Sequence, residues 1–334
     1  MPETYRAIQQ QRFTDTFRDA TEIVELPITQ PRSGELRVRN LHCGINGIFD
    51  TQIARDAVDY VKIGLPTFTG VEAIGVVEAV GADVAEFSIG DAVATTRFGR
   101  GYREINTAPA SEFVRVPEAT PDILTLASTG VSALLALEHI GQVRDGETVA
   151  ISAAAGGLGH LLVQLALLRG CTVIGVAGGA QKGAFLKDLG VHRVIDYKCE
   201  DIGEILREEY PRGIDVALDS VSGKVFDDFL ANMAPHGRLV VSGAASDLDG
   251  KPEIVSAPRI AHSIYYKGVS VRGFMNGLLT DHWPEARARI FAYYAANDIK
   301  VVRDASAFRG VESIPDAVEW LLSGRSMGKV MVDI

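Results

Sequence analysis

A regular alternation of strand-like and helix-like segments between residues 147 and 245 constrains the fold of this chain more than any other feature. The strand-like segments, such as ETVAIS and CTVIGVA, are continuous apolar runs without alternating polar residues. Such runs are typical of parallel strands that helices cover on both faces. The order βαβαβαβαβ therefore predicts an α/β fold with a doubly wound parallel sheet.

The residues before this region follow a different pattern. Two β-rich runs, TEIVELPI and GELRVRNLHCG, are joined by a turn at Gln30–Gly34, and from Gly70 short apolar runs alternate with glycines and acidic turns. These patterns predict a small, bent β-barrel. The apolar spacing becomes helical after Pro121, so we place a domain boundary near residue 120. A chain of 334 residues is long enough for two domains.

The C-terminal residues match neither half clearly. They contain the strand-like VSVRGFM, an expected helix from Asp281 to Asn297, and a final strand KVMVDI. We expect this part to return to the first domain. The predicted division is thus residues 1–120 with 270–334 for the barrel domain, and residues 121–269 for the dinucleotide-binding domain.

Charge and cysteine content limit the classes of partner. The chain has 43 acidic and 33 basic residues, a formal net charge of −10. This charge does not favour nucleic acid or an anionic membrane, and it indicates a small-molecule substrate. The three cysteines form no CxxC pair, and no stretch approaches ~18 uninterrupted apolar residues. The N-terminal residues also lack the apolar core of a signal peptide, so we expect a soluble, cytoplasmic protein.

The segment SAAAGGLG, from Ser152 to Gly159, follows the first strand and opens the first helix of the alternating region. Small residues there let the backbone approach a pyrophosphate, whose charge faces the N–H groups of the helix start. This context is that of a dinucleotide fingerprint, and a tight turn without a ligand is the alternative. An alanine replaces the usual first glycine. The predicted cofactor contacts are Ala154, Gly156, Gly157 and Leu158.

The end of the second strand decides which dinucleotide binds. An Asp or Glu there would hold the ribose hydroxyls of NAD, but the strand ends at Ala177 and no acid follows. A lysine follows at position 182, and a cation beside open helix-start amides suits the 2′-phosphate of NADP. For Lys182 the alternative is a solvated lysine at a helix start, and for Tyr197 it is a half-buried strand tyrosine. The predicted contacts are Gly178, Lys182 and Tyr197.

Four segments, at residues 70–93, 128–137, 152–170 and 182–198, carry a family resemblance. The first reads GVEAIGVVEAVGADVAEFSIGDAV and the third SAAAGGLGHLLVQLALLRG. Together they resemble the medium-chain dehydrogenase/reductase superfamily, in its zinc-independent quinone-oxidoreductase and prostaglandin-reductase branch. The resemblance covers nearly the whole chain. It implies a GroES-like β-barrel catalytic domain built from both chain ends, an inserted Rossmann domain, and an active site in the cleft.

Zinc-dependent relatives carry a cysteine and a His-Glu pair in the catalytic domain. Here Gly-Ile-Asn follows Cys43, and Gly70-Val71-Glu72 stands where those relatives have Gly-His-Glu. A lone carboxylate does not hold zinc, so we expect no metal site and interpret Cys43 as a packed strand residue.

The resemblance also implies roles for single residues. Asn46 matches an asparagine that contacts the nicotinamide ribose or the substrate, with a simple turn asparagine as the alternative. The aspartate that often follows three positions later is Phe49 here, and Asp50 is the nearby acid. Ser132 matches a threonine near the nicotinamide, although a helix serine also bonds its own backbone. The further implied cofactor contacts are Ser242, Gly243, Phe274, Asn276 and Lys329.

Members of this branch most often reduce the C=C bond of α,β-unsaturated carbonyl compounds with NADPH, by hydride transfer to the β-carbon. Quinone reduction is a second reading, and a non-catalytic, crystallin-like NADPH-binding protein is a third. Charge collects on the carbonyl oxygen as an enolate, which needs a hydrogen-bond donor. We expect Asn46, Tyr60 or Tyr265 to serve in catalysis, with Tyr266 as a further candidate. The resemblance also implies a homodimer that pairs through the strand near residues 269–274.

Overall fold

The computed structural model describes residues 3–58, 62–247 and 254–334. The chain folds into two compact units. The first unit comprises Met1–Ser128 and Arg303–Ile334, and the second comprises Thr129–Val302. Each unit is described by itself below.

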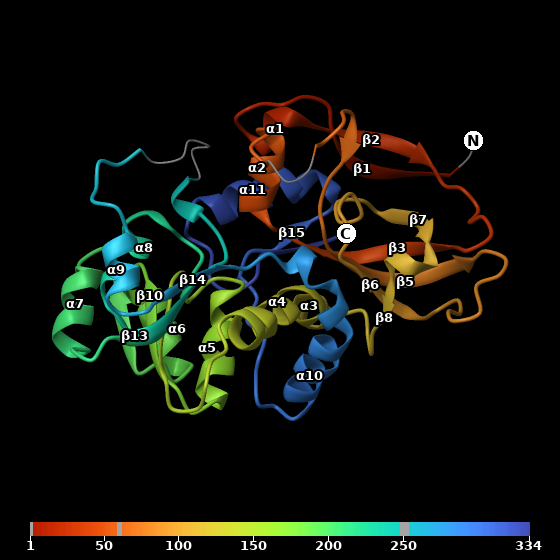
Figure 1. The fold of residues 1–334 in the computed structure, drawn as a ribbon. Coiled ribbons are helices and arrows are strands. Elements are labelled where there is room, and N and C mark those ends of the chain that lie inside the picture. The colour runs from red at the N-terminus through yellow and green to blue at the C-terminus, as the bar shows by residue number, and fades with distance from the viewer. Residues whose placement is uncertain (1–2, 59–61, 248–253) are drawn as a thin grey trace. The chain divides into compact units, whose positions relative to one another are not determined.

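Two sheets form the first unit, in red to yellow and dark blue in Figure 1. The smaller sheet has the strand order β2-β1-β4, and the larger one has the order β15-β16-β3-β5-β6-β8, with β7 paired to β3. The strands are β1 (Thr4–Gln10), β2 (Thr21–Pro27), β3 (Glu35–Gly44), β4 (Thr67–Phe68), β5 (Ala73–Val80), β6 (Ala92–Thr95), β7 (Ile105–Pro109), β8 (Val114–Arg115), β15 (Phe308–Arg309) and β16 (Met331–Asp333). The helices are α1 (Phe17–Ala20), α2 (Gly47–Ala54), α3 (Pro121–Thr125) and α11 (Ile314–Leu322).

The strand β3 joins the two ends of the chain inside this unit. It pairs antiparallel with β5 and, on its other side, with β16, where Val332 lies opposite Cys43. The amide of Ile45 donates to the carbonyl of Val330 at 3.0 Å. Alternate residues of β3, such as Leu36 and Val38, are buried in the core. The C-terminal residues are therefore placed directly beside the segment that follows β3.

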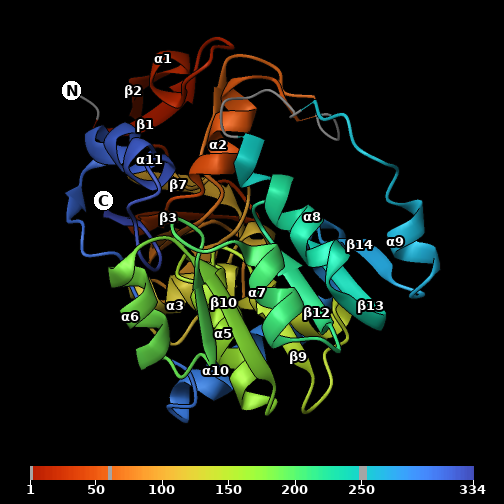
Figure 2. The ribbon, with the colours of Figure 1, turned by 90° about the vertical axis from the view of Figure 1, so that its left-hand side faces the viewer.

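The second unit contains a six-stranded parallel sheet with the order β11-β10-β9-β12-β13-β14 (Figure 2). In chain order this is 3-2-1-4-5-6, the order of the common dinucleotide-binding fold, which confirms the predicted α/β class. The strands are β9 (Thr148–Ile151), β10 (Thr172–Ala177), β11 (Arg193–Asp196), β12 (Ile214–Asp219), β13 (Met233–Val241) and β14 (Ser270–Gly273). The helices are α4 (Val131–Leu134), α5 (Gly159–Leu168), α6 (Ala180–Asp188), α7 (Ile202–Glu209), α8 (Gly223–Ala231), α9 (Ala261–Tyr265) and α10 (Trp283–Ala295).

Apolar side chains pack the helices onto this sheet. Ile202 and Leu206 of α7 and Phe229 of α8 belong to one buried cluster with residues of β10, β12 and β13. The helix α5 packs against β9 and β10. Because helices shield the central strands, those strands need no polar alternation, as the sequence pattern indicates.

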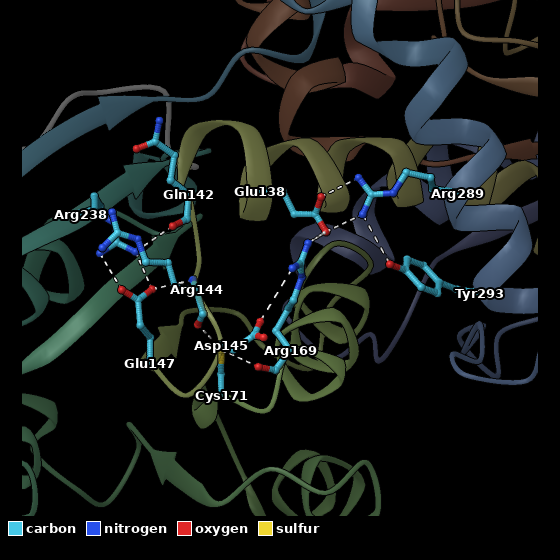
Figure 3. A network of polar contacts seen from close by, with 10 residues as sticks. All are labelled: Glu138, Gln142, Arg144, Asp145, Glu147, Arg169, Cys171, Arg238, Arg289 and Tyr293. Atoms are coloured by element: carbon cyan, nitrogen blue, oxygen red, sulfur yellow. Dashed lines mark hydrogen bonds and ion pairs between the residues drawn. The ribbon is translucent and has the colours of Figure 1, made fainter.

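The second unit extends further toward the C-terminus than the predicted division at residue 269. The strand β14 pairs in parallel with β13, with Leu239 opposite Val271. In α10, Arg289 forms two hydrogen bonds with Glu138, at 2.7 and 2.8 Å, and Arg169 binds the same carboxylate (Figure 3). Residues 270–302 thus belong to the parallel-sheet unit, whereas we expected them in the barrel domain. Backbone pairing and ion pairs between distant residues decide this, and no local pattern shows them.

One helical stretch in the described part of the chain, Pro121–Ile140, has the length and apolar composition of a membrane span. Of its most apolar window, 72% is buried inside the structure. Length and composition alone are weak evidence here, because a core helix of a soluble protein passes the same test.

Candidate functional site

The glycine-rich loop connects β9 to α5 at the edge where the parallel strands end. Ala153 has a positive φ of 46°, which bends the chain sharply after β9. A Cβ atom on Gly159 would lie 2.3 Å from the carbonyl oxygen of Ala153 and 2.7 Å from the Cα of Ala154. Only glycine therefore fits at the first position of α5, where the helix meets the bend.

This loop meets the requirements of a pyrophosphate site. Within the described residues, the amides of Gly157 and Leu158 have no hydrogen-bond partner. They precede a ten-residue helix, whose N-terminus carries partial positive charge. Unpaired donors at a helix start are the groups that bind phosphate oxygens, so the loop residues fit a dinucleotide.

His160 supports the loop from inside the second unit, a role that we did not predict. Its side chain is fully buried, with Nδ1 3.0 Å from the carbonyl oxygen of Gly156. The Nε2 atom accepts a hydrogen bond from the amide of Val302 at 3.2 Å. Since Nε2 accepts, the proton lies on Nδ1 and the ring is neutral.

The predicted adenosine end of the site lies where β10 and β11 finish. A Cβ atom on Gly178 would lie 2.7 to 2.8 Å from the ring and hydroxyl of Tyr197, so the phenol packs directly on the glycine backbone. Lys182 lies in the first turn of α6 and is half-buried. The structure thus brings Gly178, Lys182 and Tyr197 to one edge of the sheet.

An acid that we did not single out, Asp196, shapes this turn. Its Oδ1 accepts hydrogen bonds from the amides of Gly179 at 2.9 Å and Lys198 at 3.1 Å. These bonds, the Gly179 bond first, lower the pKa of the carboxyl group. Asp196 therefore holds the turn after β10 and is not placed as the acceptor at the end of that strand that NAD would require.

A second unpredicted acid, Asp219, joins the ends of three strands. It is fully buried, and its Oδ1 accepts from the hydroxyl of Ser152 at 2.7 Å and from the amide of Val221 at 2.9 Å. The hydroxyl of Ser242 donates to the backbone oxygen of Asp219 at 3.0 Å. The ends of β9, β12 and β13 are thus bonded together, with Gly243 directly after them. An aspartate that ends an apolar strand run was the available signal.

Phe274 and Asn276 follow β14. The amide of Phe274 donates to the carbonyl of Val241 at 2.8 Å, which places it beside the end of β13. The Oδ1 of Asn276 accepts from the indole nitrogen of Trp283 at 2.9 Å. The bond from Trp283 uses one lone pair of Oδ1, so a ligand could use the amide hydrogens of Asn276 and the second lone pair. Ser132 is half-buried on α4.

In the first unit, Asn46 stands beside a buried ion pair. Its Nδ2 donates to Glu72 Oε1 at 2.9 Å, and its Oδ1 accepts from the ammonium of Lys329 at 3.3 Å. The same ammonium pairs with Glu72 Oε1 and donates to the carbonyl of Ile45 at 3.1 Å. An ammonium has three hydrogens, and these three partners use all of them. The structure therefore assigns Lys329 to this network and does not support its predicted contact with the cofactor.

Asp50 is buried rather than open to a ligand. The hydroxyl of Tyr102 donates to its Oδ2 at 2.5 Å. Burial raises the pKa of the carboxyl group to about 7, against the opposing effect of the bond from Tyr102. The structure therefore gives Asp50 an internal partner and not the role that an aspartate at position 49 has in the branch.

The structure does not bring Tyr265 and Tyr266 to the edge where the strands end. Tyr265 ends α9 and is 79% exposed. Two residues later, the carbonyl of Lys267 accepts from the amide of His236, near the start of β13. Tyr265 and Tyr266 thus lie at the edge where the strands begin, opposite Ser242 and Gly243, and this position does not support a catalytic role. Tyr60 lies outside the described residues.

Cys43 and Glu72, at the positions where zinc-dependent relatives have metal ligands, do not fit a metal ion. Cys43 is fully buried, and burial raises the pKa of its thiol well above the usual value. Glu72 already holds the ammonium of Lys329, whose positive charge would oppose a second cation. Among the described residues, no group of three or more His, Cys, Asp or Glu side chains is arranged to hold a metal.

Comparisons with known proteins agree with this geometry. The family model described as alcohol dehydrogenase GroES-like domain matches residues 32–120, and the one described as zinc-binding dehydrogenase matches residues 157–292. A probable quinone oxidoreductase from Leishmania amazonensis is 34% identical over 100% of this chain and 99% of its own length. Prostaglandin reductase-3 from Mus musculus is 33% identical, over 100% of this chain and 90% of its own length.

A solved structure shows the same similarity in three dimensions. The crystal structure of Escherichia coli quinone oxidoreductase complexed with NADPH superimposes with a TM-score of 0.85 at 26% sequence identity. The match covers 98% of this chain and 100% of that chain. The barrel with an α/β unit and the dinucleotide-binding loop are thus shared with a protein that binds NADPH.

Proposed function

Because the chain belongs to the medium-chain dehydrogenase/reductase superfamily, in its zinc-independent quinone-oxidoreductase and prostaglandin-reductase branch, we propose that it reduces the C=C bond of α,β-unsaturated carbonyl compounds with NADPH. It is an NADPH-dependent oxidoreductase. The observation that carries the choice of NADPH is the end of β10, where Gly178 packs on Tyr197 and no Asp or Glu occurs among residues 178–182 to hold the ribose hydroxyls.

The chemistry requires little from the protein. Bound NADPH supplies a hydride to the β-carbon of the substrate. The chain must then hold the carbonyl oxygen, on which negative charge collects, with a hydrogen-bond donor. Asn46 is the residue that we propose for this contact or for the neighbouring ribose, since its side chain is only partly buried. A proton reaches the α-carbon from a hydroxyl group or from water.

Quinone reduction is the second candidate, because a relative with 34% identity over the whole chain is named a probable quinone oxidoreductase. A panel of enones and quinones, with NADPH and NADH followed at about 340 nm, distinguishes the two activities. Oxidation of NADPH by enones supports our proposal, and oxidation by quinones alone supports the second candidate. Binding of NADPH without any turnover would indicate a non-catalytic protein.

The position of the new hydrogen tests the reaction itself. With NADPH that carries deuterium at the transferring position, we expect deuterium on the β-carbon of a saturated ketone. The carbonyl group should stay intact, because polarising it for reduction would need a Lewis acid or a proton donor. An allylic alcohol as the main product would contradict the assignment.

We also propose that the protein forms homodimers and works in the cytoplasm. The strand β14 lies at the edge of its sheet, with Val271 38% exposed, and an edge strand can pair with a second copy. The three cysteines are free thiols, as suits a reducing compartment. Light scattering should give twice the chain mass of 35.9 kDa, and a single-chain mass at micromolar concentration would contradict the dimer.

A further inference from the structure

We infer that Glu72 and Lys329 are positioning residues that make Asn46 a hydrogen-bond donor toward its ligand. This inference rests on the proposed function and takes the first of its two contacts, the one from Asn46 to the carbonyl oxygen of the substrate. An asparagine side chain carries an acceptor and two donor hydrogens, and it can present either end. Which end faces a ligand depends on the partners that hold the other atoms.

The ion pair leaves only one orientation of the amide. An ammonium can only donate, so Lys329 must face the Oδ1 of Asn46, and the contact is 3.3 Å. An ionised carboxylate can only accept, so Glu72 must face Nδ2, at 2.9 Å. A flipped amide would place donor against donor and acceptor against acceptor. In the part of the chain that the structure describes, the second Nδ2 hydrogen has no partner, and the side chain is only partly buried, so Asn46 offers a donor.

The helix α2 gives independent evidence that the pair controls this side chain. Asn46 occupies the N-cap position of α2, where an asparagine side chain normally accepts a bond from the first turn. Here it makes no capping bond. The forgone bond is worth about 1 kcal/mol, so the contacts with Glu72 and Lys329 outcompete a favourable local alternative.

The pair is also built into the fold with little room for change. Glu72 is fully buried and Lys329 is 4% exposed. A Cβ atom on Gly44 would lie 2.2 Å from Glu72 Oε1 and 2.9 Å from Lys329 Cε, so only glycine at this point of β3 admits the pair. Burying two charges is costly unless they are paired and hydrogen-bonded. Because the pair of Glu72 and Lys329 orients the side chain of Asn46, it has a function besides packing.

The test uses the double variant Glu72→Gln/Lys329→Met, which removes both charges together and leaves no buried ion unpaired. We expect kcat for enone reduction to fall about 100-fold to 1,000-fold, as for the loss of one donor to the oxyanion. The dissociation constant for NADPH, measured by fluorescence, should change less than about threefold. Thr51→Val is the matched control, because Thr51 is buried on the same helix and its hydroxyl donates to the carbonyl of Gly47 rather than to the ion pair. It should keep its kcat within about twofold.

A mutant cycle separates positioning from a purely structural role. If Glu72 and Lys329 act through Asn46, Asn46→Ala should lower kcat strongly in the wild-type background but add little in the double variant. If Asn46→Ala lowers kcat by the same factor in the double variant as in the wild type, the inference is overturned. The mutant Asn46→Asp keeps the contact with Lys329 but loses the donor, so it should resemble Asn46→Ala.

An NMR measurement needs no substrate, so the inference is tested even if the protein reduces no enone. The side-chain amide signals of Asn46, identified by their loss in Asn46→Asp, should show one proton shifted by the bond to Glu72. In Glu72→Gln/Lys329→Met that shift should become smaller, because a neutral amide accepts more weakly than a carboxylate and can also turn its own NH₂ group toward Asn46. Identical signals in both proteins would overturn the inference, whereas a wild type without enone turnover would overturn only the proposed function.

Discussion

At the scale of single residues, buried acids distinguish this chain from a simple dinucleotide-binding scaffold. Asp50 and Glu72 are both buried, yet their partners differ, since Asp50 faces a phenol and Glu72 an ammonium. One oxygen of each carboxylate, Asp50 Oδ1 and Glu72 Oε2, has no hydrogen-bond partner among the described residues. Among the described residues no cation bonds to Asp50, and burial raises the pKa of its carboxyl group.

Asp50 should make stability depend on pH. Burial raises its pKa to about 7 in the folded state, above the value of about 3.9 in an unfolded chain. The folded state therefore binds the proton more tightly, so this group lowers the free energy of unfolding as pH rises from about 4 to about 7. Asp50→Asn keeps an acceptor for Tyr102 and cannot ionise. Relative to wild type, it should gain on the order of 3 kcal/mol between about pH 4.5 and pH 7.5.

Urea denaturation of both proteins at the two pH values checks this result. The comparison needs only the difference between the proteins, because the other titrating groups are the same in both. A pH-independent difference would show that Asp50 is ionised in the folded protein at low pH as well.

Lys182 should determine the preference for NADPH. We expect wild type to favour NADPH over NADH by at least about tenfold in kcat/KM, which corresponds to about 1.4 kcal/mol. Lys182→Ala should raise the KM for NADPH and leave that for NADH unchanged, because only NADPH carries the 2′-phosphate. Lys187→Ala is the control, since Lys187 lies in the last turn of the same helix. Equal kinetics of Lys182→Ala and wild type would place the phosphate contact elsewhere.

At the scale of elements, the contact between α5 and the bend after β9 depends on a glycine. Gly159→Ala would place a methyl group 2.3 Å from the carbonyl oxygen of Ala153, so the helix start must move away. We expect a loss of about 1–3 kcal/mol in stability and weaker NADPH binding, because the loop amides move with the helix. Thermal melts and fluorescence titration measure both.

Gly183→Ala serves as the control for this substitution. Gly183 lies within α6, and its nearest contact for an added Cβ is Val194 at 3.9 Å. Alanine is the better helix former, so this variant should be neutral or more stable by up to about 1 kcal/mol. If the dissociation constant of Gly159→Ala for NADPH equals that of the wild type, the loop does not hold the pyrophosphate.

At the scale of the whole molecule, the family model of a zinc-binding dehydrogenase matches a chain whose metal position holds an ion pair. We predict that the purified protein carries no stoichiometric zinc and that chelators do not lower its activity. Lys329 supplies a fixed positive charge beside Glu72, and a second cation there would be repelled. Elemental analysis that finds one tightly held zinc per chain would contradict this.

The sequence by itself determined the features that depend on neighbouring residues. Apolar strand runs, helix spacing and a glycine-rich segment are local signals, and they predicted the parallel sheet, the loop from Ser152 to Gly159 and the missing acid at Ala177. The resemblance extended these signals to the β-barrel and to the family. The family models, the relatives and the fold confirm both predictions. Each segment that carries the resemblance is a continuous run of residues, so the sequence alone could show it.

Only the tertiary structure decided which distant residues meet. Lys329 lies 283 positions after Asn46, and no pattern in the sequence shows that its ammonium turns to Glu72 instead of a cofactor. The bonds of Arg289 to Glu138 likewise span 151 positions, and they help to place α10 in the second unit. Such pairs form when the backbone folds the elements together, and burial then requires each charge to find a partner. The apolar periodicity of a segment indicates which face of a helix or strand is buried. It does not indicate which residue that face contacts.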